Sequence, residues 1–165
     1  MNNTKTSYKT IELDEFYIVG ISVRTINRNG SAQQDIAGLW ARFMGQNLIA
    51  EIPNKLGNEI YCMYTDYEHD YTGMYTTILG CKVGAVDNVP DGFMAKYIPS
   101  GKYRVYKAVG QIPASVGSVW NEIWQSEADD KTKINRRYLA DFDVYGENSQ
   151  APQQPEVDIF LSINE

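Results

Sequence analysis

Two stretches of the chain carry the same hydrophobic stripe at helical spacing. Apolar residues at positions i, i+3, i+4, i+7 and i+8 form one face of a helix and predict that this face packs on a core. Each residue of the second stripe lies 80 positions after its counterpart in the first. The two stripes are Ile36, Leu39, Trp40, Phe43 and Met44, and Val116, Val119, Trp120, Ile123 and Trp124. We therefore expect two similar helices that pack on one core.

Runs rich in aromatic and β-branched residues flank both stripes and predict strands. The runs before the helices are 15–25 and 93–109, the latter interrupted by a turn at 99–101. The runs after them are 60–64, 74–83, 138–145 and 157–163. Each half therefore has the order β-α-β-β, with pseudo-repeats at about 8–84 and 92–165 in a single domain of residues 1–165.

The most economical packing of two such halves is an α+β fold, a duplicated βαββ. We expect one antiparallel sheet with two helices on one face and a ligand pocket on the other. The alternative is an unduplicated α+β sandwich whose periodicity is accidental. The match at all five positions of the stripes favours duplication.

Alternation along the last two predicted strands indicates which residues lie on the face away from the helices. The aliphatic column of the last strand predicts the helix-covered side and contains Val157, Ile159, Leu161 and Ile163. The opposite column contains Asp158, Phe160 and Ser162. In the preceding strand, Phe142 and Val144 are assigned to the helix side, which leaves Asp141, Asp143 and Tyr145 opposite. By the repeat, Tyr64 joins this helix-free face, and Tyr75 joins it if the strand 74–83 follows the last strand.

A sheet face that combines tyrosines with carboxylates suits a lipophilic aromatic cation. Each ring offers cation–π attraction of about 0.5–2 kcal/mol, and a partly desolvated carboxylate gains from an incoming positive charge. The candidate ligand-binding residues are Asp143, Tyr145, Asp158, Phe160, Tyr64 and Tyr75. The alternative is a plain solvated face, which is common in antiparallel sheets.

Composition and charge exclude several other classes of protein. The net charge is −6 without a basic stripe, which disfavours direct binding of nucleic acid. The chain lacks both the roughly 20 consecutive apolar residues of a membrane helix and an apolar amino-terminal secretory signal, so we expect a cytoplasmic protein. Cys62 and Cys81 are expected to be buried free thiols. The single histidine, His69, lies in an acidic turn, so we expect no metal and no cofactor.

Short motifs along nearly the whole chain resemble those of one bacterial protein family. They are Phe16-Tyr17-Ile18-Val19-Gly20, Ile98-Pro99-Ser100-Gly101-Lys102-Tyr103, Trp120-Asn121-Glu122-Ile123-Trp124, Asp141-Phe142-Asp143-Val144-Tyr145 and Val157-Asp158-Ile159-Phe160-Leu161. In their order and spacing, the chain resembles the GyrI-like family. That family has a SOUL-like fold and is related to the multidrug-binding effector domains of AraC- and MerR-type regulators.

The resemblance implies a pocket between the halves that takes amphipathic, often cationic, compounds. Asp143 matches the family's pocket glutamate with a side chain one methylene shorter, and Tyr145 matches the tyrosine that follows it. Asp158 matches the acidic position of the last strand, and Ser162 stands where the family often has proline. The chain contains no helix-turn-helix, so a role in transcription would require a separate regulator protein.

Three functions remain open at this point. The first is a drug-binding module that senses or sequesters cationic dyes and loses affinity in Asp143→Asn or Asp158→Asn. The second is a hydrolase of reactive, cyclopropane-type genotoxins, in which one of these acids is the general base and a tyrosine the proton donor. The third, which one branch of the family suggests, is an interaction with gyrase.

Overall fold

The computed structural model describes residues 6–164. Most of the amino-terminal segment, in which we expect no secretory signal, lies outside this range. Within it the chain forms eight strands and two α-helices. They are β1 (Tyr8–Leu13), β2 (Phe16–Ile26), α1 (Ser31–Gly45), β3 (Ile60–Thr65), β4 (Met74–Val83), β5 (Met94–Ile98), β6 (Gly101–Val109), α2 (Ala114–Glu127), β7 (Ala140–Tyr145) and β8 (Glu156–Ile163). Two short 3-10 helices follow α1 and β7.

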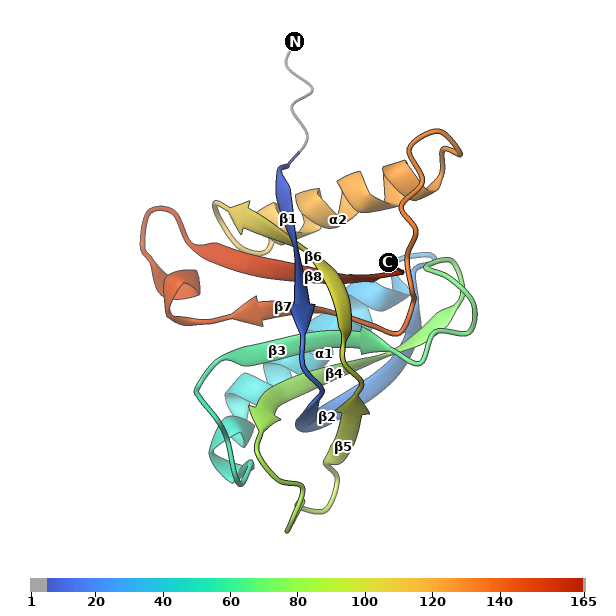
Figure 1. The fold of residues 1–165 in the computed structure, drawn as a ribbon. Coiled ribbons are helices and arrows are strands. Elements are labelled where there is room, and N and C mark those ends of the chain that lie inside the picture. The colour runs from blue at the N-terminus through green and yellow to red at the C-terminus, as the bar shows by residue number, and fades with distance from the viewer. Residues whose placement is uncertain (1–5, 165) are drawn as a thin grey trace.

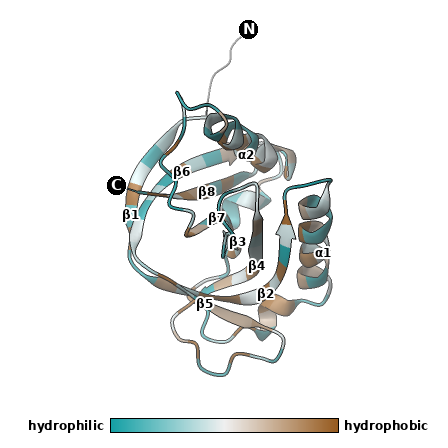
Figure 2. Ribbon diagram, turned by 90° about the vertical axis from the view of Figure 1, so that its right-hand side faces the viewer, coloured by the Kyte–Doolittle hydropathy of each residue, from teal (hydrophilic) through white to brown (hydrophobic). Residues whose placement is uncertain are grey.

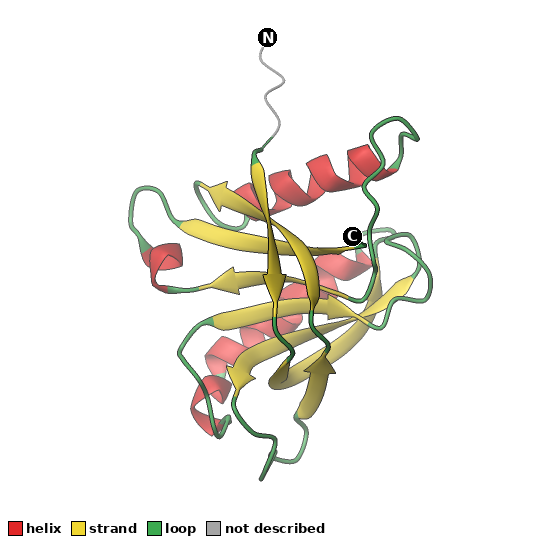
Figure 3. Ribbon diagram, viewed as in Figure 1, coloured by secondary structure: helices red, strands yellow, loops and turns green. Residues whose placement is uncertain are grey.

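All eight strands join one antiparallel sheet in the order β1-β6-β8-β7-β3-β4-β2-β5 (Figures 1 and 3). This confirms the predicted fold class. The predictions missed β1, although the apolar residues Ile11 and Leu13 alternate with polar ones there. Strand β1 pairs with β6, and strand β5 pairs with β2. The first strand of each half therefore lies in the other half's part of the sheet.

The sheet curls strongly, and both helices lie on its outer face (Figure 2). Leu39 and Phe43 of α1 pack on the first half of the sheet, and Val119 and Ile123 of α2 pack on the second. The predicted stripes are therefore buried along most of their length. Met44 is the exception, since 59% of its surface is exposed.

Two glycines allow strands β2 and β4 to approach closely within the curl. Gly20 is paired with Gly80 in the ladder. A Cβ atom at Gly80 would lie 2.0 Å from the carbonyl oxygen of Val19, a separation that no side chain tolerates. Glycine in the interior of a strand commonly marks such a close approach of backbones.

The ladder between β7 and β8 shows that the assignment of faces in β7 was wrong. Asp143 is paired with Ile159, and Phe142 with Phe160. Side chains of paired residues point to the same face, so Asp143 lies on the helix-covered side with Ile159. Tyr145 lies two residues further along and shares that side.

The physical reason is that the helix-free face is also buried. Because the sheet curls back on itself, its inner face encloses an apolar cluster of its own. The buried members of this cluster are Phe16, Ile18, Met63, Ile78, Ile98, Tyr103, Ala140 and Phe142. An apolar column in β7 therefore does not identify the side on which the helices lie.

Candidate functional site

Asp143 lies fully buried between the sheet and helix α2. The hydroxyl group of Tyr64 donates a hydrogen bond to its Oδ2 atom at 2.7 Å, and the indole Nε1 of Trp120 donates one to its Oδ1 atom at 2.8 Å. Burial raises the pKa of Asp143 to about 7, although both hydrogen bonds act to lower it. Among the described residues no lysine, arginine or histidine forms an ion pair with this carboxylate.

A second buried acid on the same strand and face differs sharply from Asp143. The Nη2 atom of Arg136 lies 2.8 Å from Oδ2 of Asp141, and both side chains are almost completely buried. Asp141 also accepts hydrogen bonds from the Tyr67 hydroxyl and from the backbone N–H and hydroxyl of Ser162. The charge of Asp141 is therefore compensated within the protein, whereas that of Asp143 is not.

Aromatic rings surround Asp143 on the helix-covered side. The ring of Tyr64 makes edge contacts with Trp120 at 5.4 Å and with Tyr75 at 6.0 Å between centroids. Further along the strand, Tyr145 makes an edge contact with Trp40 of α1 at 4.8 Å. Residues from both helices and from the central strands β3 and β7 thus form one aromatic cluster around one carboxylate.

A buried hydroxyl group beside this cluster has no hydrogen-bond partner. Thr77 of β4 is paired with Tyr64, and its side chain is fully buried on the same face. Its Oγ1 atom has no partner in the structure. Buried polar atoms are rarely left in this state, because an unmade hydrogen bond costs roughly 1–3 kcal/mol.

A pocket of about 660 Å³ opens on the helix side at the end of the cluster. Trp40 and Met44 of α1 line one wall, and Ile112 and Pro113, which precede α2, line another. Tyr145 also lines this pocket and lies two residues from Asp143 on the same face of β7. Asp143 itself is buried and does not line this pocket, so Tyr145 links the pocket to the aromatic cluster.

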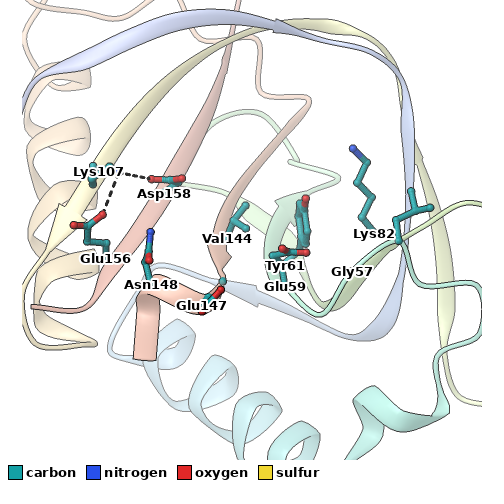
Figure 4. Close-up of a pocket in the computed structure, with 12 residues that line it drawn as sticks. Gly57, Glu59, Tyr61, Lys82, Lys107, Val144, Glu147, Asn148, Glu156 and Asp158 are labelled. Atoms are coloured by element: carbon teal, nitrogen blue, oxygen red, sulfur yellow. Dashed lines mark hydrogen bonds and ion pairs between the residues drawn. The ribbon is translucent and has the colours of Figure 1, made fainter. Parts of the chain in front are cut away.

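A different pocket, of about 550 Å³, lies on the helix-free face (Figure 4). Tyr61 and Val144 form part of its lining, and Asp158 lies at one side. The side chain of Asp158 is 45% exposed and lies 3.9 Å from the Nζ atom of Lys107, which also pairs with Glu156. The carboxylate of Asp158 is thus solvated and already close to the ammonium group of Lys107.

Four of the six predicted ligand-binding residues come together on the helix side, namely Asp143, Tyr145, Tyr64 and Tyr75. The structure places all four on the face opposite to the predicted one. Asp158 and Phe160 do not join them. Phe160 instead stacks on Phe142 at 4.7 Å in the inner cluster.

Sequence reasoning missed the roles of Trp40, Trp120 and Arg136 in this site. Both tryptophans were interpreted as core residues of the helical stripes. A buried indole N–H needs an acceptor, so a tryptophan at the same position of both helices was a usable signal. Nothing in the sequence marked Arg136 as the partner of Asp141, since the two lie in a predicted loop and strand.

Other chemistry is limited in the described part of the chain. Residues 6–164 contain no group of three or more His, Cys, Asp or Glu side chains placed to hold a metal ion. His69 is exposed and hydrogen-bonded to Asp70 in its turn, as expected. Cys62 and Cys81 are buried free thiols, also as expected. None of the helices in this range is long and apolar enough to cross a membrane.

Comparison with known proteins gives matches over nearly the whole chain. A profile of the family Cass2, integron-associated effector binding protein, matches residues 9–163. YobU of Bacillus subtilis strain 168, a candidate transcriptional regulator, is 29% identical over 154 residues, which cover 92% of this chain and 94% of YobU. The integron cassette protein VCH_CASS2 from Vibrio cholerae is 27% identical with a TM-score of 0.73, over 99% of this chain and 100% of that one. SAV2435, solved bound to tetraphenylphosphonium, is 21% identical with a TM-score of 0.80, over 96% and 94%.

Proposed function

Because this chain belongs to the Cass2 family of integron-associated effector binding proteins, we propose that it binds lipophilic aromatic cations between its two helices. In this proposal Asp143 is the counter-charge and the surrounding rings form the walls. SAV2435 shares the fold and was solved with such a cation, which supports this choice of ligand class.

The observation that carries the proposal is the uncompensated carboxylate of Asp143. It is fully buried, and among the described residues its hydrogen-bond donors are the neutral groups of Tyr64 and Trp120. A buried charge without a partner ion is costly, so a ligand cation that reaches Asp143 relieves this cost by forming an ion pair. Asp141 is unsuited to this role because Arg136 already supplies its positive charge.

The surrounding rings select for lipophilic aromatic compounds rather than for a particular hydrogen-bond pattern. Tyr64, Tyr75 and Trp120 meet at their edges, and Trp40 and Tyr145 continue this surface towards the pocket. Rings of this kind attract cations by about 0.5–2 kcal/mol each, depending on desolvation. Recognition by charge and shape alone makes the site tolerant of chemically different drugs.

Titration with tetraphenylphosphonium, followed by tryptophan fluorescence, tests the proposal directly. We expect Asp143→Asn to weaken binding by tenfold to a hundredfold, since removal of a buried counter-charge costs roughly 1.5–3 kcal/mol. Asp158→Asn is the matched control, because it removes the same charge from the opposite face. Equal affinity of the wild-type protein and Asp143→Asn would refute the role of Asp143.

The affinity for the same cation is expected to rise with pH. Asp143 has a pKa of about 7 without ligand, so its carboxyl group is mostly protonated at pH 6 and mostly ionised at pH 8. A cation favours the ionised form and must displace the proton at low pH, which predicts about a tenfold increase between these values. Calorimetry in buffers of different ionisation enthalpy should detect proton release near pH 6. The residual binding of Asp143→Asn should lack this pH dependence.

A regulatory output would pass through a separate protein. Both α-helices of the described residues pack on the sheet through their apolar faces. The net charge of −6 disfavours contact with phosphates. We therefore assign this chain the effector-binding role, and its signal would reach DNA through a partner regulator.

A further inference from the structure

Two glutamates, Glu59 and Glu147, line the pocket on the helix side of the sheet. Glu59 immediately precedes β3, and Glu147 follows β7 after Gly146. The ladder pairs Ile60 with Tyr145, so Glu59 and Gly146 continue it as neighbours. A Cβ atom at Gly146 would lie 3.4 Å from Cγ of Glu59. The Glu59 side chain therefore lies against the residue next to Glu147, and the two acids form one rim.

No ion pair among the described residues neutralises this rim, although Lys82 and Lys107 lie in the adjoining helix-free pocket. Both glutamates are exposed, and neither forms an ion pair with a lysine, arginine or histidine among residues 6–164. The lining of the helix-side pocket contains these two acids and no basic residue. The helix-free pocket also includes Glu59 and Glu147, but Lys82 and Lys107 lie in its lining. A positive group at the rim is therefore favoured on the helix side.

The rim and Asp143 lie within reach of one small molecule. Glu147 lies four positions after Asp143 along β7 and its continuation, a distance of at most about 14 Å along an extended chain. Tyr145 lies between them, and its ring contacts Trp40 in the lining of the pocket. An apolar linker that follows these two rings runs from the rim in the direction of Asp143, which lies beyond the lining of the pocket.

From this arrangement we propose that the preferred ligands carry two cationic groups joined by an apolar linker. One lipophilic cation binds at Asp143, and the second lies at the rim formed by Glu59 and Glu147. This inference rests on the proposed function, since it takes Asp143 as the inner binding point. The rim is exposed to solvent, so its contribution to the binding free energy is modest and decreases as the salt concentration rises.

The test compares two probes, decamethylene-bis(triphenylphosphonium) and decyltriphenylphosphonium, which differ in the second charged group. Two equivalent head groups alone give a statistical advantage of about twofold. We expect the wild-type protein to prefer the bis compound by about threefold to tenfold beyond this, as two exposed charge pairs would provide. Raising the ionic strength from about 0.05 M to about 0.5 M should remove most of the preference.

Glu59→Gln/Glu147→Gln should reduce the preference for the bis compound to the statistical twofold, and should weaken binding of the mono compound less than binding of the bis compound. Glu156→Gln/Asp158→Asn is the matched control, because it removes two charges from the helix-free side and should keep the preference. An equal preference in the rim variant and the wild-type protein would overturn the inference, as would the absence of any preference in the wild-type protein. If neither probe binds, the proposed function fails and the inference fails with it. If both bind through Asp143 without a rim effect, only the inference fails.

Discussion

At pH 8 the Asp143→Asn variant is expected to have a free energy of unfolding about 3–4 kcal/mol higher than that of the wild-type protein. Burial raises the pKa of Asp143 to about 7 in the folded state, from 3.8 in an exposed side chain. Between these values the unfolded chain releases the proton and the folded protein retains it, so wild-type stability falls as pH rises from about 4 to 7. Asparagine is neutral at every pH, so it does not incur this cost. It can keep both hydrogen bonds if the Tyr64 hydroxyl turns to accept one.

Urea denaturation of both proteins at pH 8 and pH 5 measures this difference. The advantage of Asp143→Asn should shrink at pH 5, where most of the folded wild-type protein is protonated at this site. Asp158→Asn should differ from the wild-type protein by less than about 0.5 kcal/mol, since its side chain is near the surface. A variant of Asp143 that is less stable than the wild-type protein at pH 8 would contradict the raised pKa. A gain in stability with a loss of ligand affinity would show that the buried acid is kept for binding.

The Arg136→Met variant is expected to lose about 3–5 kcal/mol of stability. The Arg136 side chain is buried, its Nη2 atom lies 2.8 Å from Asp141, and its Nε atom lies 3.9 Å from Glu127. Methionine fills a similar volume but leaves both acids buried without a cation, which is the costly way to break a buried ion pair. The midpoint of urea denaturation at pH 7 measures this loss.

The double variant Arg136→Met/Asp141→Asn separates charge from packing. If the lost charge causes the effect, neutralising Asp141 should restore a large part of the stability. If the double variant is as unstable as Arg136→Met, the loss comes from packing around the guanidinium, which also lies 4.1 Å over the ring of Tyr138. Wild-type stability in Arg136→Met would show that Asp141 is satisfied by Tyr67 and Ser162 alone.

The fold class and the family could be predicted from the sequence because their signals are periodic and long. The repeated stripe around Trp40 and Trp120 identified both helices, and the comparisons confirm the resemblance to GyrI-like effector-binding proteins. The chemistry of Asp143 was also suggested by that resemblance. Strand β1 was missed because only Ile11 and Leu13 mark it, and its partner β6 lies far away in the sequence.

The face on which each side chain lies could not be predicted. Alternation of polar and apolar residues indicates which side chains are buried, but it does not indicate whether a helix or the curled sheet buries them. Phe142 and Ile159 are both buried, one inside the curl and the other beneath α2. Sequence alone does not specify the register between β7 and β8, and a one-residue error moves every side chain of a strand to the other face. Tyr64 and Tyr145 kept their relation to Asp143 because one error moved them together. Tyr75 was assigned by analogy with β8, and it also lies on the helix side, against Tyr64. Asp158 and Phe160 lie in β8, whose face was assigned correctly, and so they were separated from the rest.

The exchange of β1 and β5 has a topological consequence. The two repeats are interlocked, because each extends its opening strand along the flank of the other. If the link at residues 84–93 were cut, three ladders would still join the two fragments, namely β1–β6, β2–β5 and β3–β7. The first repeat alone would leave one edge of β2 unpaired and β1 without its partner strand. A second copy of that repeat could supply the missing strands. In a single chain these contacts are internal, and they place two different helices, which carry Trp40 and Trp120, on the same sheet.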